Sequence, residues 1–169
     1  MIRKILIVLI VLLIIAQFFR PEKNQSNDNT YHISTKYALP ANVEQVLKDG
    51  CYDCHSNYTE YPWYSQVQPV AAWMNNHVKE GKSELNFSNF TQRKIAGQNH
   101  KFEEIIETVK EHEMPLSSYT WLGMHPKAKL SDEQRQTLVN WAQAQMDMLK
   151  AQYPADSLVI KRPPPTPAK

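Results

Sequence analysis

The stretch Cys51-Tyr52-Asp53-Cys54-His55 contains both cysteines of the 169-residue chain and places a histidine directly behind the second one. Two thiols at this spacing form a disulfide, a zinc site, a redox switch or the covalent attachment of a haem. A structural zinc site needs four ligands, and the sequence offers no second pair at close spacing. A thioredoxin-like motif belongs to a βαβ unit, and a disulfide across so short a loop constrains the unfolded chain little. These three readings stay open with less support than the fourth.

Haem attachment accounts for the two cysteines and the histidine together. The thiols of a Cys-x-x-Cys-His segment add to the haem vinyl groups as thioethers, and their separation on a helical turn matches the vinyl spacing. The next residue then supplies an imidazole to the iron. We therefore expect one covalent haem c per chain, attached through Cys51 and Cys54, with its iron bound by His55.

The chain around this motif has the periodicity of helices, and no alternating pattern predicts a strand. Asn42 can cap a short helix that ends just before the motif. Apolar residues at helical spacing predict further helices over residues 69–81 and 102–109. Ser131 and Gln134 have the spacing of a capping box at the start of a C-terminal helix. We therefore predict an all-α domain with long loops.

The N-terminus has the pattern of an export signal. Two basic residues precede an unbroken apolar run over residues 5–16, and Phe18, Phe19 and Arg20 follow it. Cleavage after Ala16 would need a small residue where Ile14 stands. We therefore expect an uncleaved single-pass anchor in the inner membrane with the haem domain in the periplasm. The alternative is a cleaved signal peptide and a soluble periplasmic protein.

Composition divides the chain into four segments. Residues 1–20 form the expected anchor, 21–40 a polar tether, 41–152 the haem-binding domain and 153–169 a proline-rich disordered tail. The formal net charge is only +2, and the 19 basic residues are mixed with 17 acidic ones. We therefore expect no nucleic-acid partner.

Four segments of the chain resemble the small haem-binding domain family of exported, Bacteroidetes-type bacterial proteins. The segments are residues 51–57, 61–65, 113–116 and 125–142, and the resemblance spans roughly residues 39–148. The Cys-x-x-Cys-His element is common to c-type cytochromes, and the aromatic block behind it makes the match more specific. The resemblance implies a covalent haem in a cytochrome-c-like helical domain.

Three residues compete for the second axial position on the iron. Met114 precedes Pro115, which disfavours helix at Met114 and presents its thioether from a loop before the last helix. We expect Met114 to be the distal ligand, and a thioether opposite an imidazole raises the reduction potential. His125 lies in the same loop and is the main rival, with Met124 beside it. An open distal position is the further alternative.

Several aromatic residues follow the motif, and stiff rings can cover the apolar face of a haem at low entropic cost. Trp63 and Trp73 are our candidates for haem contact, although ordinary core packing explains such residues equally well. We also expect Trp141, on the last helix, to pack against the motif helix.

A six-coordinate haem in a small domain favours one-electron transfer. The expected partners are redox proteins of the periplasm or inner membrane, together with the membrane itself. A haem-based redox or gas sensor, or a peroxidase-like protein with an open distal site, is the alternative. A disulfide-bonded adhesion module is the non-haem possibility. The sequence contains no recognisable catalytic constellation, so a carrier or binding module is favoured over an enzyme.

Overall fold

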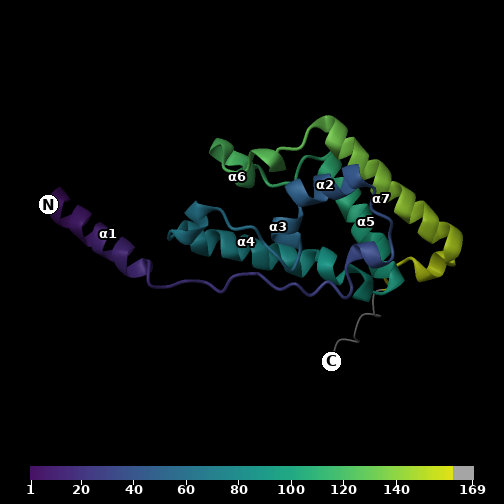
Figure 1. The fold of residues 1–169 in the computed structure, drawn as a ribbon, viewed down its shortest axis with the longest axis horizontal. Helices are drawn as coiled ribbons and strands as arrows, with labels where there is room; N and C mark the ends of the chain where they lie inside the picture. Colours follow the sequence, from purple (N-terminus) through teal and green to yellow (C-terminus); the bar gives the residue numbers. More distant parts are fainter. Residues whose placement is uncertain (162–169) are drawn as a thin grey trace, which may run out of the picture. The chain divides into compact units, whose positions relative to one another are not determined.

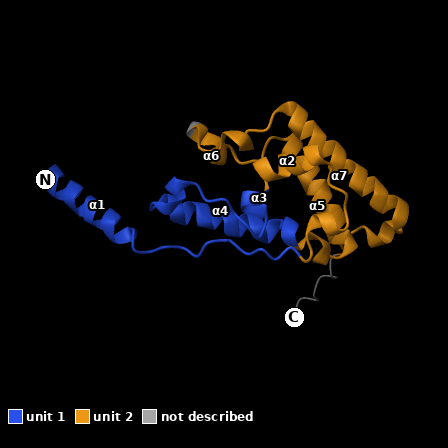
Figure 2. Ribbon diagram, viewed as in Figure 1, with its two compact units in different colours: residues 1–29, 52–88 blue, residues 30–51, 89–169 orange. Residues whose placement is uncertain are grey.

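The computed structural model describes residues 1–161, with the side chain of Leu122 excepted. Across these residues the chain forms helices and no strand, which confirms the predicted all-α class (Figure 1). The chain divides into two compact units (Figure 2). Unit 1 comprises Met1–Asn29 and Tyr52–Ser88, and unit 2 comprises Thr30–Cys51 and Asn89–Lys169. Residues 162–169 of the predicted proline-rich tail lie outside the described part.

Unit 1 contains α1 (Ile2–Ala16), α3 (Tyr52–His55), the 3-10 turn η2 (Trp63–Gln66) and α4 (Val70–Glu84). Helix α4 begins directly after Pro69, as the sequence predicts, but it continues through Gly81 to Glu84. Its buried residues Ala71, Met74 and Val78 follow the helical period and form one stripe. The short helix α3 contains residues 52–55 of the cysteine motif. It packs against α4.

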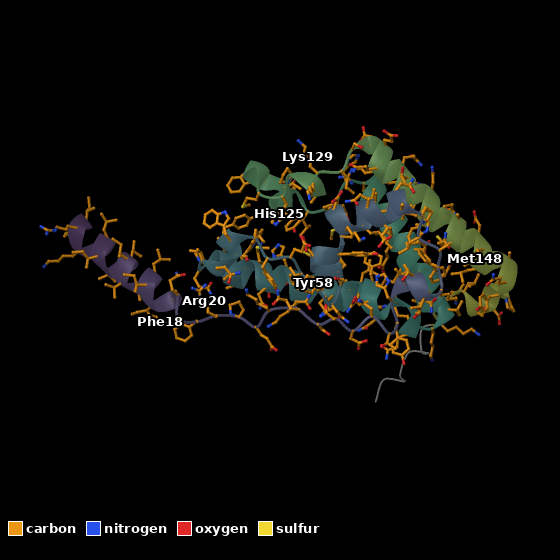
Figure 3. All side chains as sticks on the ribbon, in the orientation of Figure 1. Phe18, Arg20, Tyr58, His125, Lys129 and Met148 are labelled. Atoms are coloured by element: carbon orange, nitrogen blue, oxygen red, sulfur yellow. The ribbon has the colours of Figure 1, made fainter. Side chains whose placement is uncertain are left out.

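Helix α1 corrects the prediction of a membrane anchor. It has 15 residues, a rise of about 22 Å, whereas a bilayer core is about 30 Å thick. After Ala16 the helix ends, and Phe18 and Arg20 lie beyond it (Figure 3). Among the described residues, no helix combines the length and apolar character needed to cross a membrane. The predicted inner-membrane localisation is therefore wrong.

The segment predicted as a polar tether, residues 21–40, is bonded and partly buried. Gln25 forms an antiparallel bridge with Tyr58, and the Ser26 amide donates to the Asn57 carbonyl at 2.9 Å. Further along, in unit 2, Ile33 and Tyr37 are buried. Composition indicated a polar linker because it does not reveal these contacts, which are made largely by the backbone and by amide side chains.

Unit 2 contains α2 (Ala41–Gly50), α5 (Ile95–Lys110), α6 (Ser117–Thr120) and α7 (Asp132–Gln152). Helices α5 and α7 pack along one another, and α2 packs against α7 (Figure 1). Five 3-10 turns join or flank them, of which η3 begins in unit 1: η1 (Ile33–Thr35), η3 (Phe87–Gln92), η4 (Trp121–Gly123), η5 (Pro126–Ala128) and η6 (Ala155–Ser157). Leu158, within the predicted tail, is buried.

Aromatic rings form the centre of unit 2. Phe102 lies 4.9 Å from Tyr37, 5.0 Å from Phe90 and 5.6 Å from Trp141, measured between ring centroids. The Trp141 indole donates to the carbonyl of Ala38 at 2.9 Å. Trp141 therefore packs on α5, and its expected contact with the motif helix stays a prediction.

Two further helix boundaries differ from the sequence predictions. Helix α2 begins at Ala41 with Pro40 as its cap, where we expected Asn42 to cap it. Helix α5 begins at Ile95, seven residues before the predicted start. The capping box of α7 is confirmed, because the Ser131 hydroxyl accepts from the Gln134 amide at 3.2 Å and the reciprocal bond measures 2.8 Å.

Candidate functional site

The cysteine motif begins at the end of one helix and continues into another. Cys51 is the last residue of its segment in unit 2, and its amide donates to the Leu47 carbonyl at 2.9 Å, closing α2. Tyr52–His55 then form the single-turn helix α3 of unit 1. Cys54 lies on this helical turn and Cys51 precedes it, so the expected spacing of the two thiols on one turn stays a prediction.

The imidazole of His55 is oriented by two backbone carbonyls of α4 and its end. Its Nδ1 lies 2.9 Å from the Gly81 oxygen and 3.0 Å from the Leu85 oxygen. Because carbonyl oxygens only accept, Nδ1 must carry the proton, and the ring lone pair is then on Nε2. Histidines that bind metals are typically held through their other nitrogen in this manner. His55 therefore has the tautomer that an iron ligand requires.

Gly81 permits the close approach of α3 and α4. A Cβ atom at this position would lie 2.7 Å from the carbonyl oxygen of Cys54 and 3.2 Å from its carbonyl carbon. Both are backbone atoms, so they cannot rotate away as the end of a side chain can. Any side chain at Gly81 would therefore separate the motif from the helix whose carbonyls hold His55.

The loop behind the motif is bonded back to the middle of α3. The Thr59 hydroxyl donates to the Asp53 carbonyl at 2.5 Å, and the Glu60 amide donates to the Asp53 carboxylate at 2.9 Å. Thr59 is fully buried. Asp53 thus shapes the turn after the motif.

In the described part of the chain no disulfide joins Cys51 and Cys54. Burial raises the pKa of Cys54 to about 12, with a further contribution from the charge of Asp53. At neutral pH this sulfur therefore keeps its proton, and the protonated thiol is the species whose S–H bond adds across a vinyl group.

Met114 lies in unit 2, and its backbone is bonded on both sides. Its amide donates to the Thr108 carbonyl at 3.1 Å, and its carbonyl accepts from Arg135 at 2.6 Å. A Cβ atom built on Gly50 would lie 3.1 Å from the Pro115 ring. Pro115, the residue after Met114, therefore packs against Gly50, the residue before Cys51. Within unit 2, Met114 and Cys51 thus lie in the same region.

His125 is oriented in a similar way to His55. Its Nδ1 lies 3.0 Å from the Tyr119 carbonyl, and its ring stacks on the Tyr119 ring with centroids 3.7 Å apart. The residue lies on the segment between α6 and α7 (Figure 3). Met124, its neighbour, has its amide bonded to the Trp121 carbonyl at 3.1 Å. The geometry of unit 2 therefore leaves both Met114 and His125 as candidate ligands.

The two predicted haem-contact tryptophans lie in unit 1 and differ in surroundings. Trp63, in η2, is 79% exposed and makes an edge contact with Tyr64. Trp73, in α4, is 37% exposed and its ring lies 4.4 Å from that of His77. Trp73, His77 and Gly81 are spaced by four residues, so they share the face of α4 that meets Cys54. Contact of either tryptophan with a haem stays a prediction.

Comparison with known families decides what kind of domain this is. The profile of a family described as a haem-binding domain matches residues 11–144. The chain belongs to this family. Comparisons with curated proteins and with solved structures returned no match. The resemblance seen in the sequence is thus confirmed at the level of a haem-binding domain, and haem is its cofactor; the Bacteroidetes-type assignment stays a prediction.

The donor set of the haem-binding domain fits a covalently attached haem. It offers a protonated thiol at Cys54, a second thiol at Cys51 and an imidazole with its lone pair on Nε2 at His55. The close contact at Gly81 keeps α3 against the carbonyls that orient this imidazole.

Two residues of this haem-binding domain escaped the sequence analysis. Gly81 was interpreted as a helix end, although an isolated glycine inside a helical pattern also signals close packing. Asn24 lies within the predicted tether but bonds the loop after His55, because its side-chain amide donates to the Ser56 carbonyl at 2.9 Å. No local pattern marks such an asparagine, since its partners are more than thirty residues away.

Proposed function

We propose that this haem-binding domain is a c-type cytochrome that carries single electrons. In this proposal one haem is attached through Cys51 and Cys54, with His55 as the proximal iron ligand and Met114 as the distal ligand. When bound, the haem supplies reversible one-electron chemistry at its iron. The partners would be proteins that deliver or accept one electron.

The orientation of His55 is the observation that carries the proposal. Its Nδ1 is directed at the carbonyls of Gly81 and Leu85, which sets the lone pair on Nε2 before any ligand is present. If the two thiols formed a disulfide, nothing would require the histidine behind them to be oriented in this way. The arrangement is what a proximal ligand requires.

Support for Met114 comes from unit 2 alone. The contact between the Gly50 and Pro115 positions brings the Met114 segment to the end of α2, where Cys51 stands. The bond from Arg135 to the Met114 carbonyl holds that segment. A thioether ligand on the iron stabilises the ferrous state, so the proposed carrier would have a raised reduction potential.

The attachment is tested on the full chain, made in a host with cytochrome c maturation machinery. We expect a pyridine haemochrome spectrum and an intact mass that exceeds the bare chain by one haem. Cys51→Ser together with Cys54→Ser should abolish the added mass. A colourless protein with the mass of the bare chain would refute the proposal.

The distal ligand is tested by comparing Met114→Ala with His125→Ala and Met124→Ala. We expect only Met114→Ala to remove the far-red charge-transfer band between methionine and ferric iron and to lower the reduction potential. The opposite pattern, in which only His125→Ala changes the spectrum, would assign the distal position to histidine. Rapid carbon monoxide binding by the unaltered ferrous protein would favour the alternative, a sensor or peroxidase-like protein with an open site.

A further inference from the structure

Residues 24–28 lie along the loop that follows His55 and are bonded to it by backbone and side-chain groups. The Thr59 amide donates to the Asn24 carbonyl at 2.9 Å, and the Ser26 amide donates to the Asn57 carbonyl at 2.9 Å. The Asn57 side-chain amide donates in turn to the Asp28 carbonyl, also at 2.9 Å. Because these residues belong to unit 1, the contacts are internal to one compact unit.

Asn24 makes the largest set of these contacts. Its side-chain Nδ2 donates to the Ser56 carbonyl and to the Thr59 hydroxyl, each at 2.9 Å. Its backbone amide donates to the Tyr61 hydroxyl at 2.9 Å. Ser56 and Thr59 are buried, so water does not readily replace a lost donor. One asparagine therefore bonds three residues of the loop behind the ligand.

Lys82 connects Asn24 to helix α4, in addition to the loop after His55. Its ammonium group donates to the Asn24 Oδ1 at 2.6 Å. Lys82 directly follows Gly81, whose carbonyl orients His55. Partial burial lowers the pKa of Lys82, as expected of an ammonium that has exchanged water for a protein partner.

We propose that Asn24 and Lys82 form a clamp that positions His55 for iron ligation. The clamp joins α4, which orients the imidazole, to the carbonyl of Ser56, the residue next to His55 along the chain. It acts through His55 and touches no reacting atom, so both members are positioning residues. This inference rests on the proposed function, because it assigns His55 to the iron.

The chain offers a matched control for each member. Asn27 lies on the same segment and is exposed, and Lys79 lies on the same helix and is exposed. Asn24→Ala removes three side-chain bonds, whereas Asn27→Ala removes an exposed amide. Asn24→Asp retains an oxygen for Lys82 but turns a second oxygen toward the Ser56 carbonyl, so it should behave like Asn24→Ala.

The test measures the haem-bearing variants by two readouts that a merely structural role would not move. These are the reduction potential and the hyperfine-shifted haem methyl resonances of the ferric protein, which report the orientation of the axial imidazole. We expect Asn24→Ala and Asn24→Asp to shift both, and Asn27→Ala to match the unaltered protein. Hydrogen exchange at the Thr59 amide should become about tenfold faster in Asn24→Ala.

A haem-bearing Asn24→Ala variant with unchanged potential and resonances would overturn the clamp and leave the proposed function standing. An unaltered chain without haem would overturn both. If Asn24→Ala does not fold, the reduction potentials of Lys82→Met and Lys79→Met are compared instead. Each variant removes one positive charge, and only Lys82→Met breaks the clamp. Equal potentials in these two variants would overturn the proposal, and a shift confined to Lys82→Met would support it.

Discussion

The two units of this haem-binding domain are stabilised by different kinds of contact. Unit 2 is centred on Phe102, which touches three other aromatic rings between α5, α7 and the segment before α2. In unit 1 the region around the cysteine motif is connected by hydrogen bonds that Asn24, His55 and Thr59 donate and that Asp53 accepts. Apolar packing dominates in one case and directional polar contacts in the other.

This difference follows from what each region has to do. Apolar burial contributes free energy in proportion to area and tolerates small shifts of the partners. A hydrogen bond fixes distance and angle, and breaking one inside a buried network costs more than its net contribution to stability. Polar contacts therefore suit a segment whose purpose is to hold one imidazole in one orientation. Substitutions in the aromatic cluster of unit 2 should therefore act mainly on stability, and substitutions in the polar contacts around His55 should act on the site.

The largest effect on stability is expected from Phe102→Ala. Phe102 is fully buried in the aromatic cluster, so truncation removes apolar burial and leaves a cavity. The free energy of unfolding should fall by about 3–5 kcal/mol, as urea denaturation of the full chain can measure. Covalent haem in the surviving folded fraction should remain, because the aromatic cluster includes none of Cys51, Cys54 and His55.

Phe19→Ala is the matched control, since Phe19 is 71% exposed. Its unfolding free energy should stay within about 0.5 kcal/mol of the unaltered protein. A comparable loss in both variants would contradict the assignment of the stability of unit 2 to its aromatic cluster.

The same contrast explains how much of the molecule the sequence predicted. Helices α2, α5 and α7 of unit 2 were anticipated because the apolar period and the Ser131 capping box are local signals, whereas the short helix α6 was not. Haem binding was anticipated from the five adjacent residues 51–55, and the family match confirms it at the level of a haem-binding domain. The individual roles of Cys51, Cys54 and His55 stay predictions. The start of α5 was missed because residues 95–101 include buried polar residues, Gln98 and Lys101, which interrupt the apolar stripe.

The contacts that position His55 were not predictable in this way. The carbonyls of Gly81 and Leu85 belong to the backbone, and any residue type supplies a carbonyl. Asn24 reaches a loop more than thirty residues away, in a segment whose composition indicates a linker. The anchor was mispredicted for a related reason, because apolar composition over residues 5–16 does not determine how far the helix extends.

A smaller effect, but one specific to unit 1, is expected from Gly81→Ala. The added methyl group would meet backbone atoms of Cys54 at 2.7 Å, so α3 and α4 must separate. Overpacking of this kind costs about 1–3 kcal/mol, and we expect the yield of covalent haem to fall with it. Urea denaturation and the haemochrome absorbance per chain measure the two quantities.

Gly97→Ala provides the counterpart in unit 2. A Cβ atom there would meet only the Arg93 side chain, at the ordinary contact distance of 3.6 Å. Helix α5 should therefore be stabilised by about 0.5–1 kcal/mol through the lower backbone entropy of the unfolded chain. Stabilisation by both substitutions would show that the approach of Cys54 to α4 is not tight.

The smallest effect concerns the hydrogen bond between Tyr37 and Gln98 in the aromatic cluster. The Tyr37 hydroxyl donates to the Gln98 side-chain oxygen at 2.5 Å, so Tyr37→Phe should cost about 1 kcal/mol at neutral pH. Burial raises the pKa of Tyr37 well above its ordinary value, and the charge of Tyr153 adds to this. The folded protein therefore keeps this hydroxyl protonated where the unfolded chain ionises it.

The sign of the pH dependence follows from that difference. Above about pH 10 the unfolded chain releases the proton and the folded protein does not, so the unfolding free energy falls by up to about 1.4 kcal/mol per pH unit. Tyr37→Phe lacks this contribution, while every other tyrosine titrates in both proteins. Urea denaturation between pH 8 and pH 11 should therefore show the advantage of the unaltered protein shrinking as pH rises. A constant difference over that range would mean that Tyr37 is not sealed from solvent, and that the core of unit 2 is less exclusively apolar than its rings suggest.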